Sequence, residues 1–319
     1  MSAQPPQQQH NYAPRSGFDT SGASGLYHSA RPDYPQDAIR KILNAAAGSS
    51  KGSPVSLLEI GSGTGISTQS VLEGAAKTIA GDGGERVTFQ RYLAVEPSAG
   101  MRQDWTKHIS RDLLPKLPAG LLANDADVAC VDGTFENVSE ALSGGEEQGL
   151  YDVVLIAQAF HWCQDIPGSL NAIAKALKKG GYLALIWNME DQSDETGAKW
   201  VREARTQYER FEDGTPQFRH RYWASMYKEP ALNDQYEVVP AEFFSRKLPT
   251  TVEGVKNRVL SKSYISVLPQ QKQDELMKGI ESIFAQSSSD DEIGRVWIDE
   301  QKGVFEYPYQ TELLLFKKK

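Results

Sequence analysis

The chain has 319 residues, of which 39% are hydrophobic and 24% charged, so it is long enough to bury a large core. Its formal net charge of -8 at pH 7 argues against a broad contact with nucleic acid, because such contacts use clustered lysine and arginine. No apolar run approaches the roughly 18 residues of a membrane helix, and the first residues lack the apolar core of a signal peptide. We therefore expect a cytoplasmic protein whose partners include neither nucleic acid nor a membrane.

Residues 1–17 are rich in Gln, Pro, Ser and Gly and contain few apolar side chains. Such a segment cannot offset by burial the entropy that it would lose on ordering. It predicts a disordered tail over 1–17, followed by a single domain over 18–319. The two cysteines, Cys130 and Cys163, have the spacing of neither a disulfide framework nor a metal site, so we expect reduced thiols and no metal.

From residue 36 onward, helical and strand-like patterns alternate along the chain. Apolar residues recur at helical spacing after Pro35, and again over 166–179, where Gly180 and Gly181 are expected to end the helix. Between these lie short runs of Val, Ile and Leu that are typical of strands covered on both faces. The pattern predicts a doubly wound α/β sheet with strands at 55–60, 91–96, 126–133, 151–160 and 181–188.

The first predicted strand ends in a glycine-rich turn, "EIGSGTG". Glycines allow the backbone to turn sharply and to approach a ligand closely. The turn differs from a dinucleotide-binding fingerprint, because Ile66 stands where a third glycine is needed, and no lysine follows as in a phosphate-binding loop. In doubly wound sheets, ligands bind beyond the carboxyl ends of the strands, so this turn is a candidate ligand site.

Polar residues also follow the second and third strands. Glu96 ends the second strand, and an acidic residue there can accept hydrogen bonds from both hydroxyls of a ribose, which indicates a nucleoside. Asp132, Gly133 and Thr134 follow the third strand, where they could meet an adenine edge. Asp-Gly pairs are also common in surface turns, so a plain turn remains an alternative for Asp132.

Five motifs occur in the order and approximate spacing of the class I S-adenosylmethionine-dependent methyltransferases, which residues 18–190 resemble. They are "EIGSGTG", "AVEPSAGM", "DGTFEN", "YDVVLIAQAFHW" and "LKKGGYLALIW". Shorter motifs, "YHSARPDYP", "AFHW" and "YPYQTELLLF", look like the branch that contains trans-aconitate methyltransferases and fungal cantharidin-type small-molecule methyltransferases. The resemblance implies a Rossmann-like, mostly parallel seven-stranded sheet with an antiparallel last strand.

The resemblance also implies S-adenosyl-L-methionine as the cofactor and a role for each matching position. The glycines of the turn would line its methionine and ribose portions, and Glu59 would support the turn or the amino group. Arg31 and Tyr27, from the segment before the first strand, would meet the methionine end, where arginine suits a carboxylate. The implied cofactor-binding residues are Tyr27, Arg31, Glu59, Gly61, Gly63, Gly65, Glu96, Pro97, Met101, Asp132, Gly133, Thr134, Ala157 and Gln158.

His161 and Trp162, which follow the fourth strand, are the candidate catalytic residues. His161 is a possible general base, although a hydrogen-bonded structural histidine is the competing interpretation. A carboxylate acceptor is already ionised at neutral pH and needs no base, because methyl transfer then depends on positioning and on excluding water. Residues 191–230 carry amphipathic helical patterns and are predicted to form a lid over the acceptor.

These observations favour an enzyme that methylates a small molecule, most simply at an oxygen of a carboxylic acid, and that is a monomer or a weak homodimer. Two alternatives remain open. One is a cofactor-binding regulatory or scaffold protein that has kept the fold without turnover. The other is a methyltransferase acting on a macromolecule, which the acidic charge and the predicted lid disfavour.

Overall fold

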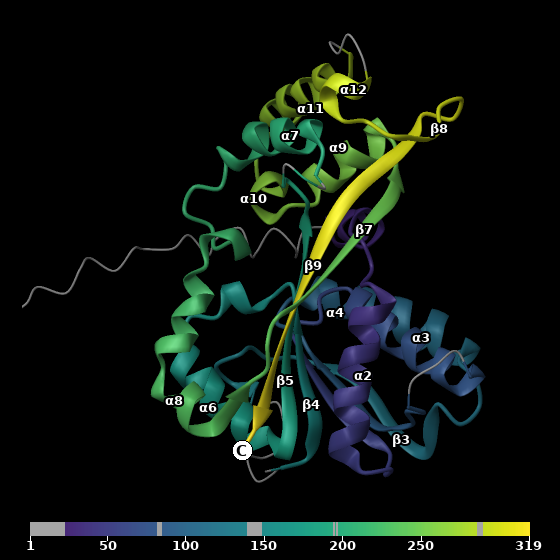
Figure 1. The fold of residues 1–319 in the computed structure, drawn as a ribbon, viewed down its shortest axis with the longest axis vertical. Helices are drawn as coiled ribbons and strands as arrows, with labels where there is room; N and C mark the ends of the chain where they lie inside the picture. The colour runs from purple at the N-terminus through teal and green to yellow at the C-terminus, as the bar shows by residue number, and fades with distance from the viewer. Residues whose placement is uncertain (1–22, 82–84, 139–148, 194, 196, 286–289) are drawn as a thin grey trace, which may run out of the picture.

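The computed structural model describes residues 23–81, 85–138, 149–193, 195, 197–285 and 290–319. The predicted tail over 1–17 lies outside these residues. The central feature is a sheet of nine strands in the described part of the chain, with the order β3-β2-β1-β4-β5-β9-β6 and with β7 and β8 also paired to β9 (Figure 1). Its strands are β1 (Val55–Ile60), β2 (Phe89–Val95), β3 (Leu122–Val131), β4 (Tyr151–Ala157), β5 (Leu177–Glu190), β6 (Tyr236–Val238), β7 (Glu242–Thr250), β8 (Trp297–Asp299) and β9 (Val304–Lys318).

Strands β1 to β5 are parallel, and the strand order reverses at β1, which pairs with β2 on one side and β4 on the other. The antiparallel pairing of β9 with β5 confirms the predicted last strand. The predicted count of seven strands was wrong. The additional pairings all involve β9, which is 15 residues long and pairs with β5, β6, β7 and β8. Strands as short as β6 and β8 carry too few side chains to show an alternating pattern.

Helices cover both faces of the sheet, as the doubly wound prediction requires (Figure 1). Alternate residues of β1 enter different cores: Leu57 packs with α2 and α3, whereas Leu58 packs with α6 and α8. Near-continuous apolar strands are therefore explained by burial on two sides. The helices are α2 (Gln36–Ser50), α3 (Ile66–Ala80), α6 (Ile166–Ala176) and α8 (Pro230–Gln235), with α4 (Ala99–Trp105) and a π-helical segment (Thr106–Leu113) near α3.

The predicted end of the helix α6 was wrong. It ends at Ala176 rather than at the glycine pair, because β5 already begins at Leu177. Gly180, with φ of 80°, and Gly181 lie in a stretch of β5 where the register against β4 shifts. The glycines therefore accommodate an irregularity in a strand.

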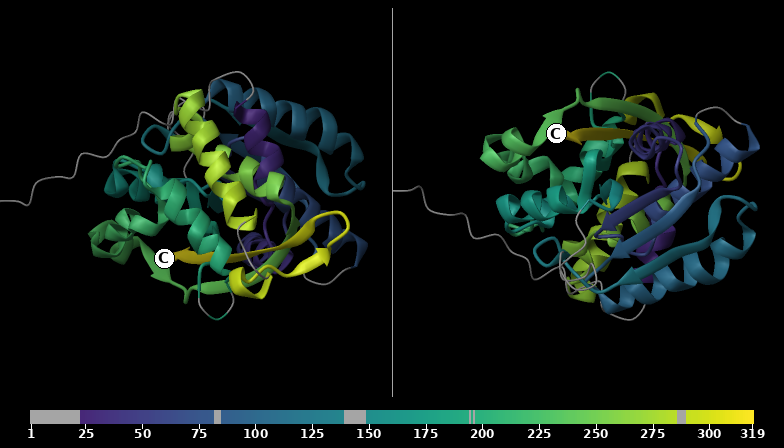
Figure 2. Two further views of the ribbon diagram at one scale, coloured as in Figure 1. Left: turned by 90° about the horizontal axis from the view of Figure 1, so that it is seen from above. Right: turned by 90° about the horizontal axis from the view of Figure 1, so that it is seen from below.

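A second group of helices packs over the carboxyl-end edge of the sheet, and we call this group the cap. Its apolar core includes Trp200, which contacts the rings of Phe284, Phe305 and Tyr307. Figure 2, in the view from above, shows the yellow-green helices of this group lying over the sheet. The cap consists of α7 (Lys199–Glu209), α9 (Val252–Leu260), α10 (Ser263–Ser266), α11 (Gln270–Ala285) and α12 (Asp290–Ile293).

The segment predicted as a lid, 191–230, contributes only part of the cap. It contains α7 and the short 3-10 turns Phe218–His220 and Tyr222–Lys228. Trp223 in the second turn stacks on Trp187 of β5, with ring centroids 4.7 Å apart. This aromatic contact fixes the segment against the sheet next to the carboxyl end of β5.

Candidate active site

One pocket lies between the carboxyl ends of the parallel strands and the cap. It is lined from below by the turns after β1, β2, β3 and β4 and by the last residues of β5, and from above by α7, α9 and the 3-10 turn at Phe218. The N-terminal helix α1 (Ala23–Ala30) closes one side through Tyr27. The pocket is therefore at the point where the strand order reverses, which is where doubly wound sheets bind ligands.

The glycine turn approaches this pocket with its backbone. Gly61 has φ of 74°, and a Cβ there would lie 2.7 Å from the Cβ of Ala159. Gly61 and Gly63 line the pocket, whereas Gly65 does not. Gly65 precedes α3 with φ of 92°, and its α-carbon faces Ile109 in the neighbouring π-helical segment. Glycine is required at 61 both by the backbone angle and by the lack of space.

Glu59 lies beneath the turn and does not reach the pocket. Its side chain is fully buried and accepts hydrogen bonds from Thr68 Oγ1 (2.6 Å), Tyr92 Oη (2.7 Å) and Ser67 Oγ. Burial raises the pKa of this carboxyl, and the three hydroxyl donors oppose that effect. Of the two roles suggested by the sequence, its position fits support of the turn.

Glu96 lines the pocket at the end of β2 and holds the glycine turn. Its Oε2 accepts a hydrogen bond from the N–H of Gly63, and its Oε1 accepts one from the N–H of Ser98, each over 2.9 Å. The side chains of Pro97 and Met101 line the same part of the pocket. A carboxylate held by two backbone donors is fixed in direction, so the position of this side chain in the pocket is well defined.

Of the three residues predicted after β3, the structure brings two to the pocket. Gly133 and Thr134 line it, and Thr134 is held by Asn137 Oδ1, which accepts from its N–H over 2.6 Å and from its hydroxyl over 3.0 Å. Asp132 is exposed and does not line the pocket; its carboxylate pairs with Arg102 Nη1 at 3.0 Å. The position of Asp132 therefore fits the interpretation as a surface turn, because its ion pair with Arg102 holds the carboxylate outside the pocket.

Tyr27 and Arg31 reach the pocket together from α1 and the turn that follows it. The guanidinium of Arg31 lies 4.6 Å from the ring centre of Tyr27, which is a cation–π arrangement. Its Nε donates to Ser261 Oγ (3.0 Å) and its Nη2 to Ser261 O (2.9 Å) at the end of α9. Ala157 and Gln158 line the pocket as well, and Gln158, which has φ of 54°, donates from its side-chain amide to Asn188 O over 2.7 Å.

His161 and Trp162 also line the pocket, in a 3-10 turn after β4. The indole N–H of Trp187 donates to Nδ1 of His161 over 3.4 Å, which leaves Nε2 to carry the proton of the neutral ring. Burial, aided by the positive charge of Arg31, lowers the pKa of His161 to about 3. The imidazole is therefore neutral, and its Nε2–H can donate a hydrogen bond. His161 is better suited to the role of a hydrogen-bond donor than to that of a general base.

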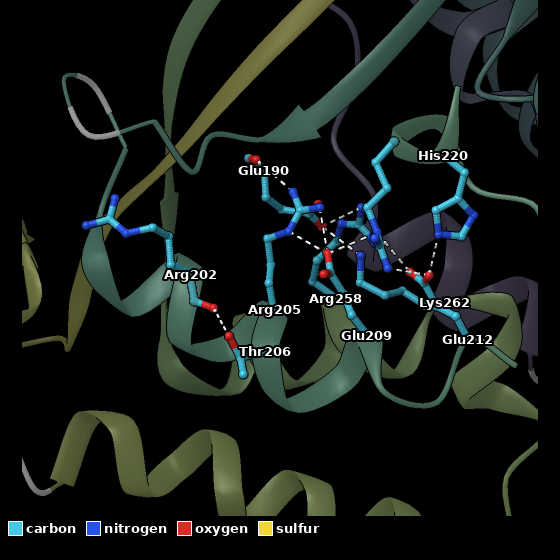
Figure 3. A network of polar contacts seen from close by, with 10 residues as sticks. Glu190, Arg202, Arg205, Thr206, Glu209, Glu212, His220, Arg258 and Lys262 are labelled. Carbon is cyan, nitrogen blue, oxygen red and sulfur yellow. Dashed lines mark hydrogen bonds and ion pairs between the residues drawn. The ribbon is translucent and has the colours of Figure 1, made fainter. Parts of the chain in front are cut away.

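The cap contributes a charged network that the sequence analysis missed (Figure 3). At one end, the buried Glu190 pairs with Arg258 Nη2 at 2.7 Å and Lys262 Nζ at 3.0 Å. Although burial alone would raise the pKa of Glu190, these cations hold it well below its usual range. At the other end, Arg219 joins Glu209, at 3.3 Å, to Glu212.

Glu190 could have been found from the sequence, because it ends β5 and the residues that follow strands form the site. Arg258 and Lys262 follow no strand, so nothing local marks them. The described residues contain no group of three or more side chains that could hold a metal ion. In the same part of the chain, no helix is long and apolar enough to span a membrane.

A sheet of this topology, with a glycine turn after β1 and an acidic residue at the tip of β2, defines the class of nucleoside-binding methyltransferase folds. A family model described as "Methyltransferase domain" matches residues 27–237. The chain therefore belongs to this methyltransferase family, which confirms the class expected from the motifs.

Among similar proteins are two described as uncharacterized methyltransferases. One, from Mycobacterium bovis, is 30% identical over 181 residues, which are 57% of this chain and 55% of the relative. The other, from Schizosaccharomyces pombe, is 28% identical over 188 residues, covering 59% and 58%. The chain spans about half the length of these curated relatives. A solved structure described as a type II methyltransferase from Anaeromyxobacter dehalogenans has a TM-score of 0.50 at 13% identity, covering 89% of this chain and 97% of that one, which shows the fold alone.

Proposed function

We propose that the protein is an S-adenosylmethionine-dependent methyltransferase that acts on a small-molecule acceptor, and that the methyl group goes to an oxygen of a carboxylic acid. The observation that carries this proposal is the composition of the pocket between the strand ends and the cap: a nucleoside-type site at the strand ends is continuous with a cationic site in the cap. The narrower resemblance to the trans-aconitate and cantharidin-type branch is part of the same proposal.

The residues on the sheet side fit the cofactor. Glu96 would accept from the ribose hydroxyls, and the bare backbone at Gly61 and Gly63 leaves room for the chain that joins ribose to methionine. Arg31, held by Ser261, would face the methionine carboxylate. When bound, this cofactor supplies a methyl group on a positively charged sulfur, which is already reactive toward nucleophiles.

The residues on the cap side fit an acidic acceptor that needs no base. Arg205, Arg219, Arg258 and Lys262 line the pocket there against three carboxylates. A carboxylate oxygen is ionised at neutral pH, so the protein has only to orient it and to exclude water. The neutral His161 would donate its Nε2–H to one acceptor oxygen and leave the other free to react.

The two alternatives predict different surfaces and affinities. A scaffold without turnover would bind the cofactor but transfer nothing, whereas a macromolecular acceptor would need an open groove. The cap helices α7 and α9 contribute side chains to the pocket directly above the strand ends, which favours a small acceptor.

Calorimetric titration with S-adenosylmethionine and with S-adenosylhomocysteine tests the cofactor half of the proposal. We expect micromolar binding that is lost in Glu96→Ala and retained in Glu73→Ala, whose side chain pairs with Gln69 on α3. Transfer of labelled methyl from the cofactor to members of a carboxylic acid panel tests the other half. Absence of cofactor binding by the wild type would overturn the enzyme assignment, and binding without transfer to any acid would overturn the acceptor class.

A further inference from the structure

At the Glu190 end of the charged network in the cap, the cationic side chains outnumber the carboxylates that pair with them. Glu190 is the only carboxylate that the structure pairs with Arg258 and Lys262 among the residues it describes. At the opposite end, Glu209 and Glu212 share Arg205 and Arg219, so the charges there are matched. The surplus cation is therefore localised where α9 meets the end of β5 (Figure 3).

Three buried polar atoms at this end, two of Arg258 and one of Tyr208, have no hydrogen-bond partner in the described part of the chain, although Nη2 of Arg258 pairs with Glu190. Nε and Nη1 of Arg258 have no acceptor in the described structure, although the side chain is only 4% exposed. The hydroxyl of Tyr208, which is 2% exposed, is likewise unpaired there. Both side chains line the pocket. Buried donors are costly to leave unsatisfied, so an arrangement of this kind is typical of a site completed by a ligand.

We propose that the acceptor carries a second anionic group, separate from the atom that is methylated, and that Arg258 and Lys262 bind it beside Tyr208. This inference rests on the proposed function and narrows its acceptor class to small acids with two charged groups. Arg258 and Lys262 would then be the residues that determine specificity, because a neutral group would leave the guanidinium donors without a charged acceptor.

The surroundings of Lys262 supply a second consequence. Burial and the positive charge of Arg258 lower the pKa of Lys262 to about 7. The charge of Arg31 also lowers this pKa, and the carboxylate of Glu190 opposes these effects. Its ammonium also lies 4.4 Å from the ring centre of Tyr208. An anion bound here would favour the charged form of Lys262, so binding near pH 7 takes up protons.

The test uses the full-length protein and two probes of nearly equal shape, glutarate and its monoamide. Calorimetry at pH 7 is carried out with and without saturating S-adenosylhomocysteine. We expect the wild type to bind the dianion about tenfold more tightly than the monoamide, and Arg258→Gln and Lys262→Met to lose this preference. Equal binding of the two probes by the wild type, including no binding of either, would overturn the inference.

Matched controls come from α9, which carries Arg258, and from α7, which carries Tyr208. Lys256→Met removes a lysine of α9 that pairs with Glu253 and Glu281, and Arg202→Gln removes an arginine of α7 that points away from the network (Figure 3). Both variants are expected to keep the wild-type preference. A loss of preference in the controls as well would assign the effect to helix stability and reject the specific site.

Proton uptake on binding is a second measurement, and it can be made even if the variants of Arg258 do not fold. The wild-type binding enthalpy of glutarate is measured in MOPS and in imidazole, whose ionisation enthalpies differ, and the difference reports the protons taken up. We expect uptake in the wild type and none in Lys262→Met. Equal wild-type binding enthalpies in the two buffers would mean that no proton is taken up and would contradict the role of Lys262.

The cofactor controls separate this inference from the proposed function. S-adenosylhomocysteine and methylthioadenosine, which lacks the amino acid end, are titrated into each variant. If Arg258 and Lys262 served the cofactor carboxylate instead, their variants would lose affinity for the first compound and not for the second, which would reject the acceptor subsite. Failure of the wild type to bind S-adenosylhomocysteine would reject the proposed function, while the glutarate titration without cofactor still decides the anion site.

Discussion

The carboxylate of Glu96 and the backbone N–H of Gly63 are joined by a hydrogen bond of 2.9 Å, so the tip of β2 holds the turn that follows β1. The same carboxylate is expected to bind the ribose. One side chain thus fixes the shape of the turn and is proposed to contact the ligand, and an isosteric change tests both roles together.

Glu96→Gln should weaken cofactor binding about tenfold or more with little loss of folded structure. The amide keeps the volume of the side chain, but its NH2 group would face the N–H of either Gly63 or Ser98, both of which need an acceptor. Calorimetry with S-adenosylhomocysteine measures the affinity, and thermal unfolding measures the stability. Unchanged affinity in a folded variant would show that Glu96 does not contact the ligand.

Gly61→Ala should lower the unfolding midpoint more than Gly52→Ala does. Both glycines have positive φ, 74° and 86°, so both substitutions carry a backbone cost of about 1 kcal/mol. At Gly52 a Cβ would meet no atom within 4 Å, whereas at Gly61 it would lie 2.7 Å from Ala159. The difference between the variants isolates this clash. Equal midpoints would mean that the turn relaxes easily.

The His161 ring should remain neutral between pH 8 and pH 5, since burial lowers its pKa to about 3. A histidine with a lowered pKa keeps its neutral form as the pH falls until that pKa is reached. The ring proton signals, assigned by their absence in His161→Gln, are followed by NMR across this range. A titration step near pH 6.5 would show a solvated imidazole and restore the possibility of a general base.

Cofactor affinity should fall between pH 7 and pH 5 as α1 leaves the glycine turn. His28 on α1 stacks on His108 with ring centres 3.6 Å apart, and its Nδ1 lies 3.0 Å from Thr64 Oγ1. Burial is the main cause that lowers the pKa of His28. The positive charges of His108 and Lys107 lower it further, and the negative charge of Asp104 opposes them.

The sign of this effect follows from the lowered pKa. A protonated His28 is disfavoured when α1 is docked, so docking is fully favoured above pH 6.5 and is lost as the pH falls below it. His28→Phe keeps a stacked ring that cannot take up a proton, and it should bind S-adenosylhomocysteine with a weaker dependence on pH. The same slope in the variant and the wild type would exclude this contribution of His28.

The sheet could be predicted from the sequence because its strands are buried on both faces. A short continuous apolar run, such as Val153 to Ile156, is typical of a strand of this kind. The sequence also predicted the positions that follow each strand, since parallel strands bring their carboxyl ends together. The position of the Asp132 side chain outside the pocket could not be predicted, because it depends on an ion pair with Arg102, which lies 30 positions earlier. Arg258 was missed for a related reason: its helix reaches the pocket only through long-range packing of the cap.

The strand β9 has a mechanical consequence. Residues 309–317 pair with β5 in the body of the sheet, and residues 305–313 pair with β7, so pairing is uninterrupted from the body to the cap core at Phe305. A cap built on a continuous strand cannot swing open on a flexible hinge without bending that strand or breaking its ladder. Ligand exchange must then occur through smaller movements, and α1, which has no strand pairing, is the element best suited to them.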